Sequence, residues 1–218
     1  MKDNYAHRHC SHLYALFNGL PEEIATKAPL RKAFQVAAEK RMEIRRRENG
    51  GEMAFGLVQL GQCASSLRDA QMSYDVVDWL ANNYWSPNMV TTHNPKSLFN
   101  TDLCGGLPAI IIKMLVDSQP GWIELLPALS KEWPTGRIEG IRCRGQLEVR
   151  TLAWDGNRIT VTLRSGTAQK THIKLTGGIE SIEVKQGPRS AIDATAGGDG
   201  QVVRLPAGRE VTFTIIRK

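Results

Sequence analysis

The sequence predicts an α+β protein of two domains, in which helices fill the first half of the chain and an antiparallel β-domain fills the second. Apolar residues recur at three- and four-residue spacing as far as about residue 118, whereas apolar and polar residues alternate from residue 147 onward. The period changes within the segment from Trp122 to Gly140. We therefore expect domains at 1–121 and 122–218, the second of them a β-sandwich.

Helices are expected where apolar positions keep helical spacing and where proline or glycine marks an end. The first runs from Leu30 to Arg47, begins after Pro29 and stops at Asn49-Gly50-Gly51. Its last turn holds Arg45, Arg46 and Arg47, whose charges favour the negative end of the helix dipole. The other expected helices are Met53 to Ser66 and Ala70 to Tyr84, joined near Arg68-Asp69, and Leu107 to Ser118.

Strands are expected where the alternation is regular, separated by turns such as Asp155-Gly156-Asn157, Gly177-Gly178, Gly187-Pro188 and Gly197-Gly198. The expected strands are 147–150, 158–163, 172–175, 179–184, 202–205 and 211–216.

Composition excludes several classes of protein. The 218 residues are 41% hydrophobic and 23% charged, which is ordinary for a globular chain. No run of 18 apolar residues occurs, so no membrane-spanning helix is expected. The net charge is +6, but the arginines of the second half are scattered singly, which predicts a solvated face and no nucleic-acid partner. Four cysteines without a CxxC pair predict neither a zinc ribbon nor a dense disulfide framework.

The segment His7-Arg8-His9-Cys10-Ser11-His12 places three imidazoles, a thiol and a guanidinium within six residues. Metal ligation, a substrate pocket and a structural role are the possible interpretations. In an extended chain His7 and His9 share a face and His12 does not, and no carboxylate lies nearby in the sequence to orient the rings. We therefore expect no bound metal, while the pocket and structural interpretations stay open.

The segment from Asn100 to Gly106 places Asp102 and paired glycines directly before an expected helix. Free amides at a helix N-terminus stabilise an anion, so Asp102 should stay ionised, which suits a base and not an acid. The alternative is that Asp102 only caps the helix and that Gly105-Gly106 make its turn. Cys104 has no identifiable activating base and is expected to be a small buried residue.

The stretch His93-Asn94-Pro95 lies between the helical hairpin and the Asp102 segment, and a turn is its simplest explanation. A catalytic set of Ser11, His93 and Asp102 could be assembled on paper. No GxSxG sequence supports such a set, so we do not expect it.

Several of these segments, taken together, carry a resemblance to a known family. The sequence resembles glycoside hydrolase family 95, the inverting α-L-fucosidases and related enzymes. The matching stretches, whose order and spacing agree with the family, are His7 to Tyr14, Leu16-Phe17, Phe99-Asn100-Thr101-Asp102, Lys113-Met114-Leu115, Leu125 to Leu129, Trp133-Pro134-Thr135-Gly136 and Gly140 to Gly145.

The resemblance covers essentially the whole chain but only the C-terminal portion of a family member. It implies that residues 1–121 are the last helices of an (α/α)6 catalytic toroid and that 122–218 are the C-terminal β-domain. Asp102 then matches the acid that activates the attacking water, while the general-acid glutamate and the water-positioning asparagines lie upstream. The sugar pocket would include His7, His9, His93 and Asn100, because such side chains can donate hydrogen bonds to sugar hydroxyls.

The implied function is that of a C-terminal fragment of an inverting glycoside hydrolase that acts on terminal α-L-fucose or a related sugar in glycans. The fragment is expected to be inactive alone, to need no cofactor or metal, and to require the missing upstream part of the toroid. The resemblance also implies a periplasmic or secreted parent enzyme. The alternative is a carbohydrate-binding or structural β-domain with a helical appendage and no catalysis.

Overall fold

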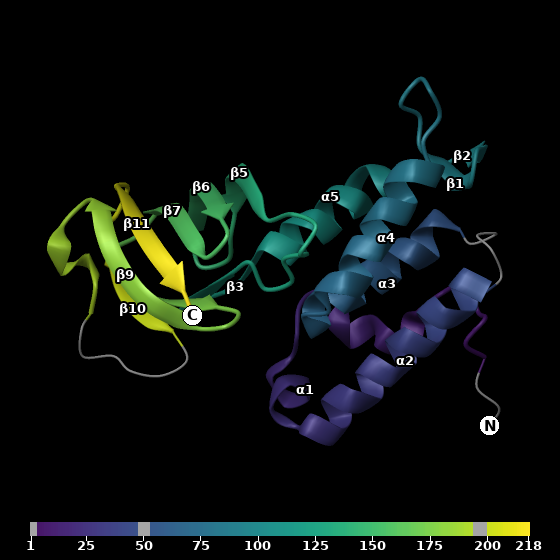
Figure 1. Cartoon of the computed structure of the whole chain (residues 1–218), viewed down its shortest axis with the longest axis horizontal. Helices are drawn as coiled ribbons and strands as arrows, with labels where there is room; N and C mark the ends of the chain where they lie inside the picture. The colour runs from purple at the N-terminus through teal and green to yellow at the C-terminus, as the bar shows by residue number, and fades with distance from the viewer. Residues whose placement is uncertain (1–3, 48–52, 194–199) are drawn as a thin grey trace. The chain divides into compact units, whose positions relative to one another are not determined.

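The protein forms two compact units, Met1–Met114 and Leu115–Lys218. The structure, a computed structural model, describes residues 4–47, 53–193 and 200–218. Figure 1 shows helices in the first unit and sheets in the second, which confirms the predicted order of helices followed by a region rich in antiparallel strands. Two expected turns, Asn49-Gly50-Gly51 and Gly197-Gly198, lie outside the described residues.

The first unit is built mainly from helices. None of the helices in the described ranges is both long enough and apolar enough to span a bilayer. In chain order the elements are the 3-10 helix η1 (Ser11–Leu16), α1 (Glu22–Thr26), α2 (Ala28–Arg47), α3 (Ala54–Leu67), α4 (Ala70–Asn83), the short strands β1 (Thr92–Asn94) and β2 (Ser97–Phe99), and α5 (Asp102–Leu115).

The expected helical hairpin is formed by α3 and α4, and local chemistry explains its tight turn. Arg68 adopts a left-handed conformation with φ of 66° and ends α3. Asp69 follows at once as the N-cap of α4, and its carboxylate accepts a hydrogen bond from the amide of Met72 at 2.9 Å. Helices α3 and α4 also pack against each other along their lengths, so α4 runs back along α3.

Helix α3 lies at the centre of the first unit, since most of its residues, including Leu57 and Leu60, are buried. Two glycines let α5 approach it closely. A Cβ atom added at Gly106 would lie 2.5 Å from Val58 Cγ2, and one added at Gly61 would lie 2.6 Å from Ile110 Cδ1. The contacts ascend together along both helices, so α3 and α5 run in the same direction.

The second unit consists of two sheets. The four-stranded sheet has the order β10-β8-β4-β3, and the five-stranded sheet has the order β5-β6-β7-β11-β9. All neighbours pair antiparallel except β4 and β8, which are parallel. The strands are β3 (Val116–Gln119), β4 (Trp122–Leu125), β5 (Thr135–Arg142), β6 (Leu147–Asp155), β7 (Arg158–Ser165), β8 (Gln169–Leu175), β9 (Ile179–Gln186), β10 (Gln201–Leu205) and β11 (Glu210–Arg217), with a 3-10 turn η2 (Arg189–Ala191).

The helix expected from Leu107 to Ser118 differs from the structure at both ends. It begins at Asp102 and ends at Leu115, after which β3 starts at once. Strand β3 pairs with β4 through a tight turn in which Gly121 has a φ of 90°. The division between the compact units, at Met114 and Leu115, falls at the end of this helix.

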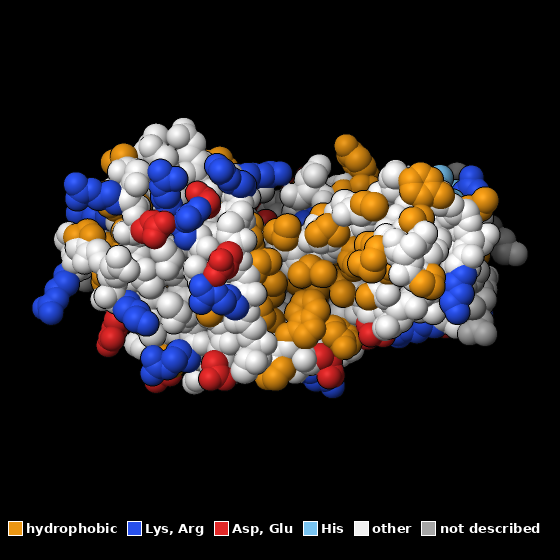
Figure 2. Space-filling model, turned by 90° about the horizontal axis from the view of Figure 1, so that it is seen from above, with side chains coloured by type: hydrophobic (Ala, Val, Ile, Leu, Met, Phe, Trp, Pro, Cys, Tyr) orange, Lys and Arg blue, Asp and Glu red, His pale blue; other side chains and the backbone are white. Residues whose placement is uncertain are grey.

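Large hydrophobic side chains are exposed on the first unit. Figure 2 shows hydrophobic side chains gathered over the helices, while Lys, Arg, Asp and Glu are frequent over the sheets. Folded chains seldom leave such side chains grouped in water without an interaction that covers them. The exposed ones among the described residues are Tyr14, Val36, Met89, Leu98, Phe99 and Ile112.

Candidate active site

One end of the helix pair α3 and α5 collects most of the residues that the sequence singled out. Asp102 opens α5, and Gly106, one turn later, contacts Val58 in the second turn of α3. The His9 ring packs edge-on against Phe55 in the first turn of α3, with 5.6 Å between ring centroids. Because the two helices run in the same direction, His9 and Asp102 belong to the same end of the pair.

The two predicted pocket histidines of the N-terminal segment lie side by side. The rings of His7 and His9 are 5.4 Å apart in an edge-to-face arrangement. The backbone amide of His9 donates to Nδ1 of His7 at 3.1 Å, which fixes that ring against its own chain. The Cys10 amide donates to Oε1 of the buried Gln59 at 2.7 Å. The segment is thus anchored to α3 immediately after the histidines.

Two arginines of α2 also contribute to this region, although the sequence pattern did not indicate such a role. Arg41 and Arg45 are 4% and 2% exposed and direct their guanidinium groups at the backbone around His7. Arg46 and Arg47, in contrast, are exposed and pair with Asp75 and Glu43. Interaction with the helix dipole therefore does not explain the position of Arg45. The feature of the sequence that could have indicated its role is the spacing of four residues from Arg41, which places both arginines on one face of the helix.

Asp102 is exposed at the first turn of α5 and is held by its neighbour Asn100. Asn100 Nδ2 donates to Asp102 Oδ2 at 2.8 Å, and the Asp102 amide donates to Asn100 Oδ1 at 2.7 Å. The side chain that covers the first amide of the helix is therefore that of Asn100. Asn100, for which the sequence predicts a place in the sugar pocket, therefore also orients the Asp102 carboxylate.

His93 lies on β1, in the two-stranded hairpin that precedes α5. Strand β1 contacts α3, and the hairpin is closed by hydrogen bonds between Thr91 and Asn100. His93 Nδ1 lies 2.6 Å from Asn94 Oδ1, so this imidazole is oriented by the adjacent residue. The hairpin thus attaches His93 to the segment that carries Asp102. It also carries Leu98 and Phe99, which are exposed and were not predicted as site residues.

The cysteines of the first unit differ in their exposure. Cys104 is exposed, which corrects the expectation that it is buried, and its Sγ lies 3.5 Å from the Thr91 hydroxyl. It falls on an outward position of the first turn of α5, a position that spacing alone did not distinguish. Cys10 and Cys63 are fully buried, and burial raises the pKa of the Cys63 thiol far above its ordinary range. Such a thiol stays protonated and unreactive.

The described residues contain no group of three or more His, Cys, Asp or Glu side chains arranged to hold a metal ion. One histidine of the N-terminal segment, His12, is held by a side chain of α2. His12 lies against Arg41, with 3.2 Å between its Nε2 and the arginine Nε.

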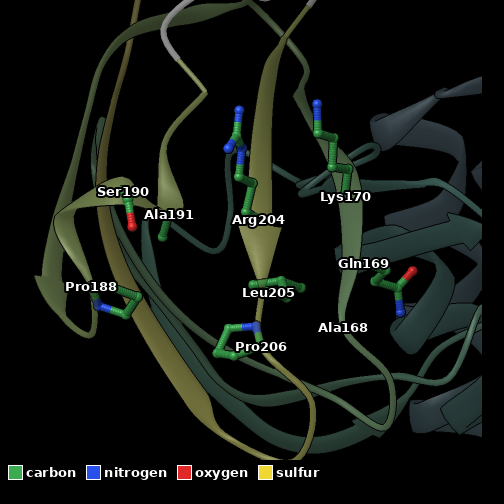
Figure 3. A pocket seen from close by; sticks show the side chains of 9 residues that line it. All are labelled: Ala168, Gln169, Lys170, Pro188, Ser190, Ala191, Arg204, Leu205 and Pro206. Carbon is green, nitrogen blue, oxygen red and sulfur yellow. The ribbon is translucent and has the colours of Figure 1, made fainter.

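A separate pocket of about 460 Å³ lies in the second unit, shown in Figure 3. The side chains of Lys170 and Arg204 extend in the same direction beside it. Both cations bind the buried Asp193, at 3.2 Å and 3.0 Å, and so attach the segment after η2 to β8 and β10. These ion pairs explain the charged residues of the pocket through the fold, without a ligand.

Comparison with known proteins finds two domain models of one family that together match nearly the whole chain. Residues 1–115 match the sequence model "Glycosyl hydrolase family 95 catalytic domain", and residues 117–215 match "Glycoside hydrolase family 95, C-terminal domain". The chain belongs to glycoside hydrolase family 95, which confirms the resemblance.

A curated relative is similar over most of the chain. Alpha-L-fucosidase 2 of Arabidopsis thaliana is 32% identical over 186 residues, which are 83% of this chain and 22% of the relative. The chain therefore spans about a fifth of the length of that protein.

Proposed function

We propose that this chain is the C-terminal part of an inverting glycoside hydrolase that removes terminal α-L-fucose or a related sugar from glycans. The observation that carries the proposal is the position of Asp102, which begins α5 at the same end of the helix pair as His9. The name of the Arabidopsis relative supports α-L-fucose as the sugar.

The proposed architecture follows from the direction of the helices. In an (α/α)6 toroid, inner helices run parallel to one another and alternate with outer helices that run back. Helices α3 and α5 share a direction, and α4 returns along α3, as inner and outer helices of such a toroid would. We assign the first unit to the end of the toroid and the two sheets of the second unit to a β-sandwich domain.

In the proposed reaction Asp102 is the base. An inverting glycosidase needs two carboxyl groups about 6.5–9.5 Å apart, with a water molecule between the base and the sugar. Oδ2 of Asp102 accepts from Asn100, and we assign the attacking water to Oδ1. His7, His9 and His93 would donate to sugar hydroxyls, and the general acid would come from the upstream part of the toroid. The glycosidic oxygen takes the proton of that acid as its bond to the anomeric carbon breaks, while water attacks that carbon from the opposite face and gives a proton to Asp102.

The proposal is tested on the enzyme extended upstream to include the remaining toroid. It should hydrolyse an aryl α-L-fucoside and release the β-anomer first, as seen by NMR of the fresh product. Asp102→Asn keeps the shape and removes the charge, so kcat should fall by at least about 100-fold. Asp78→Asn, at an exposed acid of α4, is the matched control and should retain activity. An extended enzyme without fucosidase activity, or a fully active Asp102→Asn variant, would contradict the proposal.

A further inference from the structure

We infer that Arg41 and Arg45 are positioning residues of the sugar pocket, which fix the backbone of residues 4–10 so that His7 and His9 present their rings at the active-site end of α3. The inference rests on the proposed function for the ligand of those rings. Both residues lie on α2, remote from Asp102 in sequence, and would not themselves touch the sugar.

The contacts of Arg41 define a clamp on the main chain. Its Nη1 donates to the carbonyl of His7 at 2.7 Å and lies 3.5 Å from that of Tyr5, while Nη2 lies 3.5 Å from that of Asn4. Its Nε and Nη2 also contact the two ring nitrogens of His12, at 3.2 Å and 3.3 Å. One guanidinium therefore gathers both ends of the histidine segment.

Arg45, one helical turn further along α2, extends the clamp. Its Nη2 donates to the carbonyl of Arg8 at 3.2 Å and to that of His7 at 3.4 Å. Its Nη1 donates to the carbonyl of Arg41 at 3.3 Å, and Nη2 lies 3.9 Å from the sulfur of Cys10. The His7 carbonyl is thus shared by both arginines, and the backbone beside it has little freedom to rotate.

Energetics favours a positioning role for these arginines over a role in stability alone. Burying a cation is costly, and apolar side chains of similar size often stabilise a fold as well or better. Two cations one turn apart also repel each other. A rigid guanidinium group holds several hydrogen-bond acceptors in one fixed arrangement, which an apolar side chain cannot do. Here the acceptors include the carbonyl of His7, whose ring belongs to the predicted pocket, and the carbonyls of Tyr5 and Arg8 on either side of it.

The backbone that the arginines hold is linked directly to the rings of His7 and His9. His7 Nδ1 accepts from the His9 amide at 3.1 Å, so the His7 ring follows the local backbone, and His9 rests on Phe55. A shift of about 1 Å in binding groups can cost as much as about 100-fold in rate or affinity. Loss of the hydrogen bonds to the His7 carbonyl should therefore displace the His7 and His9 rings while the fold stays intact.

The test uses the full 218-residue chain with Arg41→Met, the gentler Arg41→Lys, and Arg46→Met as control. Arg46 lies on the same helix but is exposed and pairs with Asp75. Amide hydrogen exchange at His9 and Cys10 is measured by NMR, together with the melting temperature. We expect exchange at both amides to rise at least tenfold in Arg41→Met, less in Arg41→Lys, and not in Arg46→Met, while amides within α3 keep their protection.

The second readout is a titration of the upstream-extended enzyme with methyl α-L-fucoside, in an Asp102→Asn background that slows turnover, followed through the ring signals of His7 and His9. Arg41→Met should weaken the apparent affinity at least tenfold relative to Arg46→Met. The inference is overturned if exchange at His9 and Cys10 changes only in step with global stability, or if fucoside binding is unchanged. If the extended enzyme without an arginine substitution shows no fucoside-dependent shift, the proposed ligand fails, and the exchange result alone decides whether the clamp exists.

Discussion

Asn100 and Asp102 hold each other at the start of α5 through two reciprocal hydrogen bonds, from Asn100 Nδ2 to Asp102 Oδ2 at 2.8 Å and from the Asp102 amide to Asn100 Oδ1 at 2.7 Å. The arrangement covers the first amide of the helix and restrains the carboxylate. One asparagine thereby serves both the helix and the candidate base.

Asn100→Ala should accordingly act on stability and on catalysis. Loss of the side chain that covers the helix amide should lower the stability of the chain by about 1 kcal/mol in denaturant unfolding. In the upstream-extended enzyme, kcat should fall by up to about 100-fold because Asp102 loses its orientation. Asn82→Ala, which removes an exposed asparagine that contacts Asp78 on α4, is the control. Unchanged kcat in Asn100→Ala would show that Asp102 needs no such restraint.

The 218-residue chain alone should show no measurable glycosidase activity. A general acid contributes about 10²–10⁴-fold to such reactions, and in the proposed enzyme that acid lies upstream. Turnover of an aryl α-L-fucoside is measured with the purified chain. Activity that disappears in Asp102→Asn would prove the prediction wrong and would place a complete site within these residues.

Two adjacent glycines of α5 should respond to alanine in opposite directions. A Cβ at Gly106 would meet both methyl groups of Val58, so Gly106→Ala should destabilise the chain by about 1–3 kcal/mol through overpacking. A Cβ at Gly105 would meet nothing within 4 Å, so Gly105→Ala should stabilise it by about 0.5–1 kcal/mol through helix propensity. Urea unfolding of both variants checks this. Val58→Ala should rescue Gly106→Ala in part, and equal effects at the two glycines would contradict the close packing of α3 and α5.

Glu148 should make the stability of the second unit depend on pH. A hydrogen bond from Arg150 holds the pKa of the Glu148 carboxyl below its ordinary value, with nearby Arg142 and Arg164 acting in the same direction. Because the folded-state pKa is lowered, the stabilisation is present above the ordinary glutamate value of about 4.3 and is lost as pH falls through the folded-state pKa.

The melting temperature of Glu148→Gln should therefore lie below that of the unmodified chain at pH 7, and the two should converge on acidification below about pH 4. Glu180→Gln, at an exposed position of β9, serves as the control and should show little difference at either pH. A constant difference across this range would mean that the effect of Glu148 is not electrostatic.

Much of the fold could be predicted from hydrophobic period. The hairpin of α3 and α4 and the strands from β6 to β11 have strong periodic patterns with clear turn residues between them. Strands β3 and β4 were missed because each has only four residues and because Val116 continues the apolar spacing of α5. Strand β5 was missed because it begins in the expected linking segment and has few apolar residues. Gly136 on this strand packs closely against the Trp154 ring, a contact that hydrophobic period does not reveal.

Residues of the candidate site could be predicted only where their neighbours in the sequence indicate a functional role. Asp102 was identifiable because it precedes a helix, and the histidines because they cluster. Arg41 and Arg45 were not, since a helix pattern shows which arginines share a face but not that this face is buried under residues more than thirty positions earlier. The contact from Gln59 to Cys10 is equally remote in sequence.

The parallel pairing of β4 with β8 has a consequence for how the second unit folds. Strands β6 and β7 are joined by a tight turn and can pair early, whereas β4 must wait for β8, which lies beyond three intervening strands of the other sheet. Distant pairings form slowly because a long loop must close first. In pulsed hydrogen-exchange refolding, protection of β6 and β7 should precede that of β4, so the four-stranded sheet would assemble on a five-stranded sheet that has already begun to form.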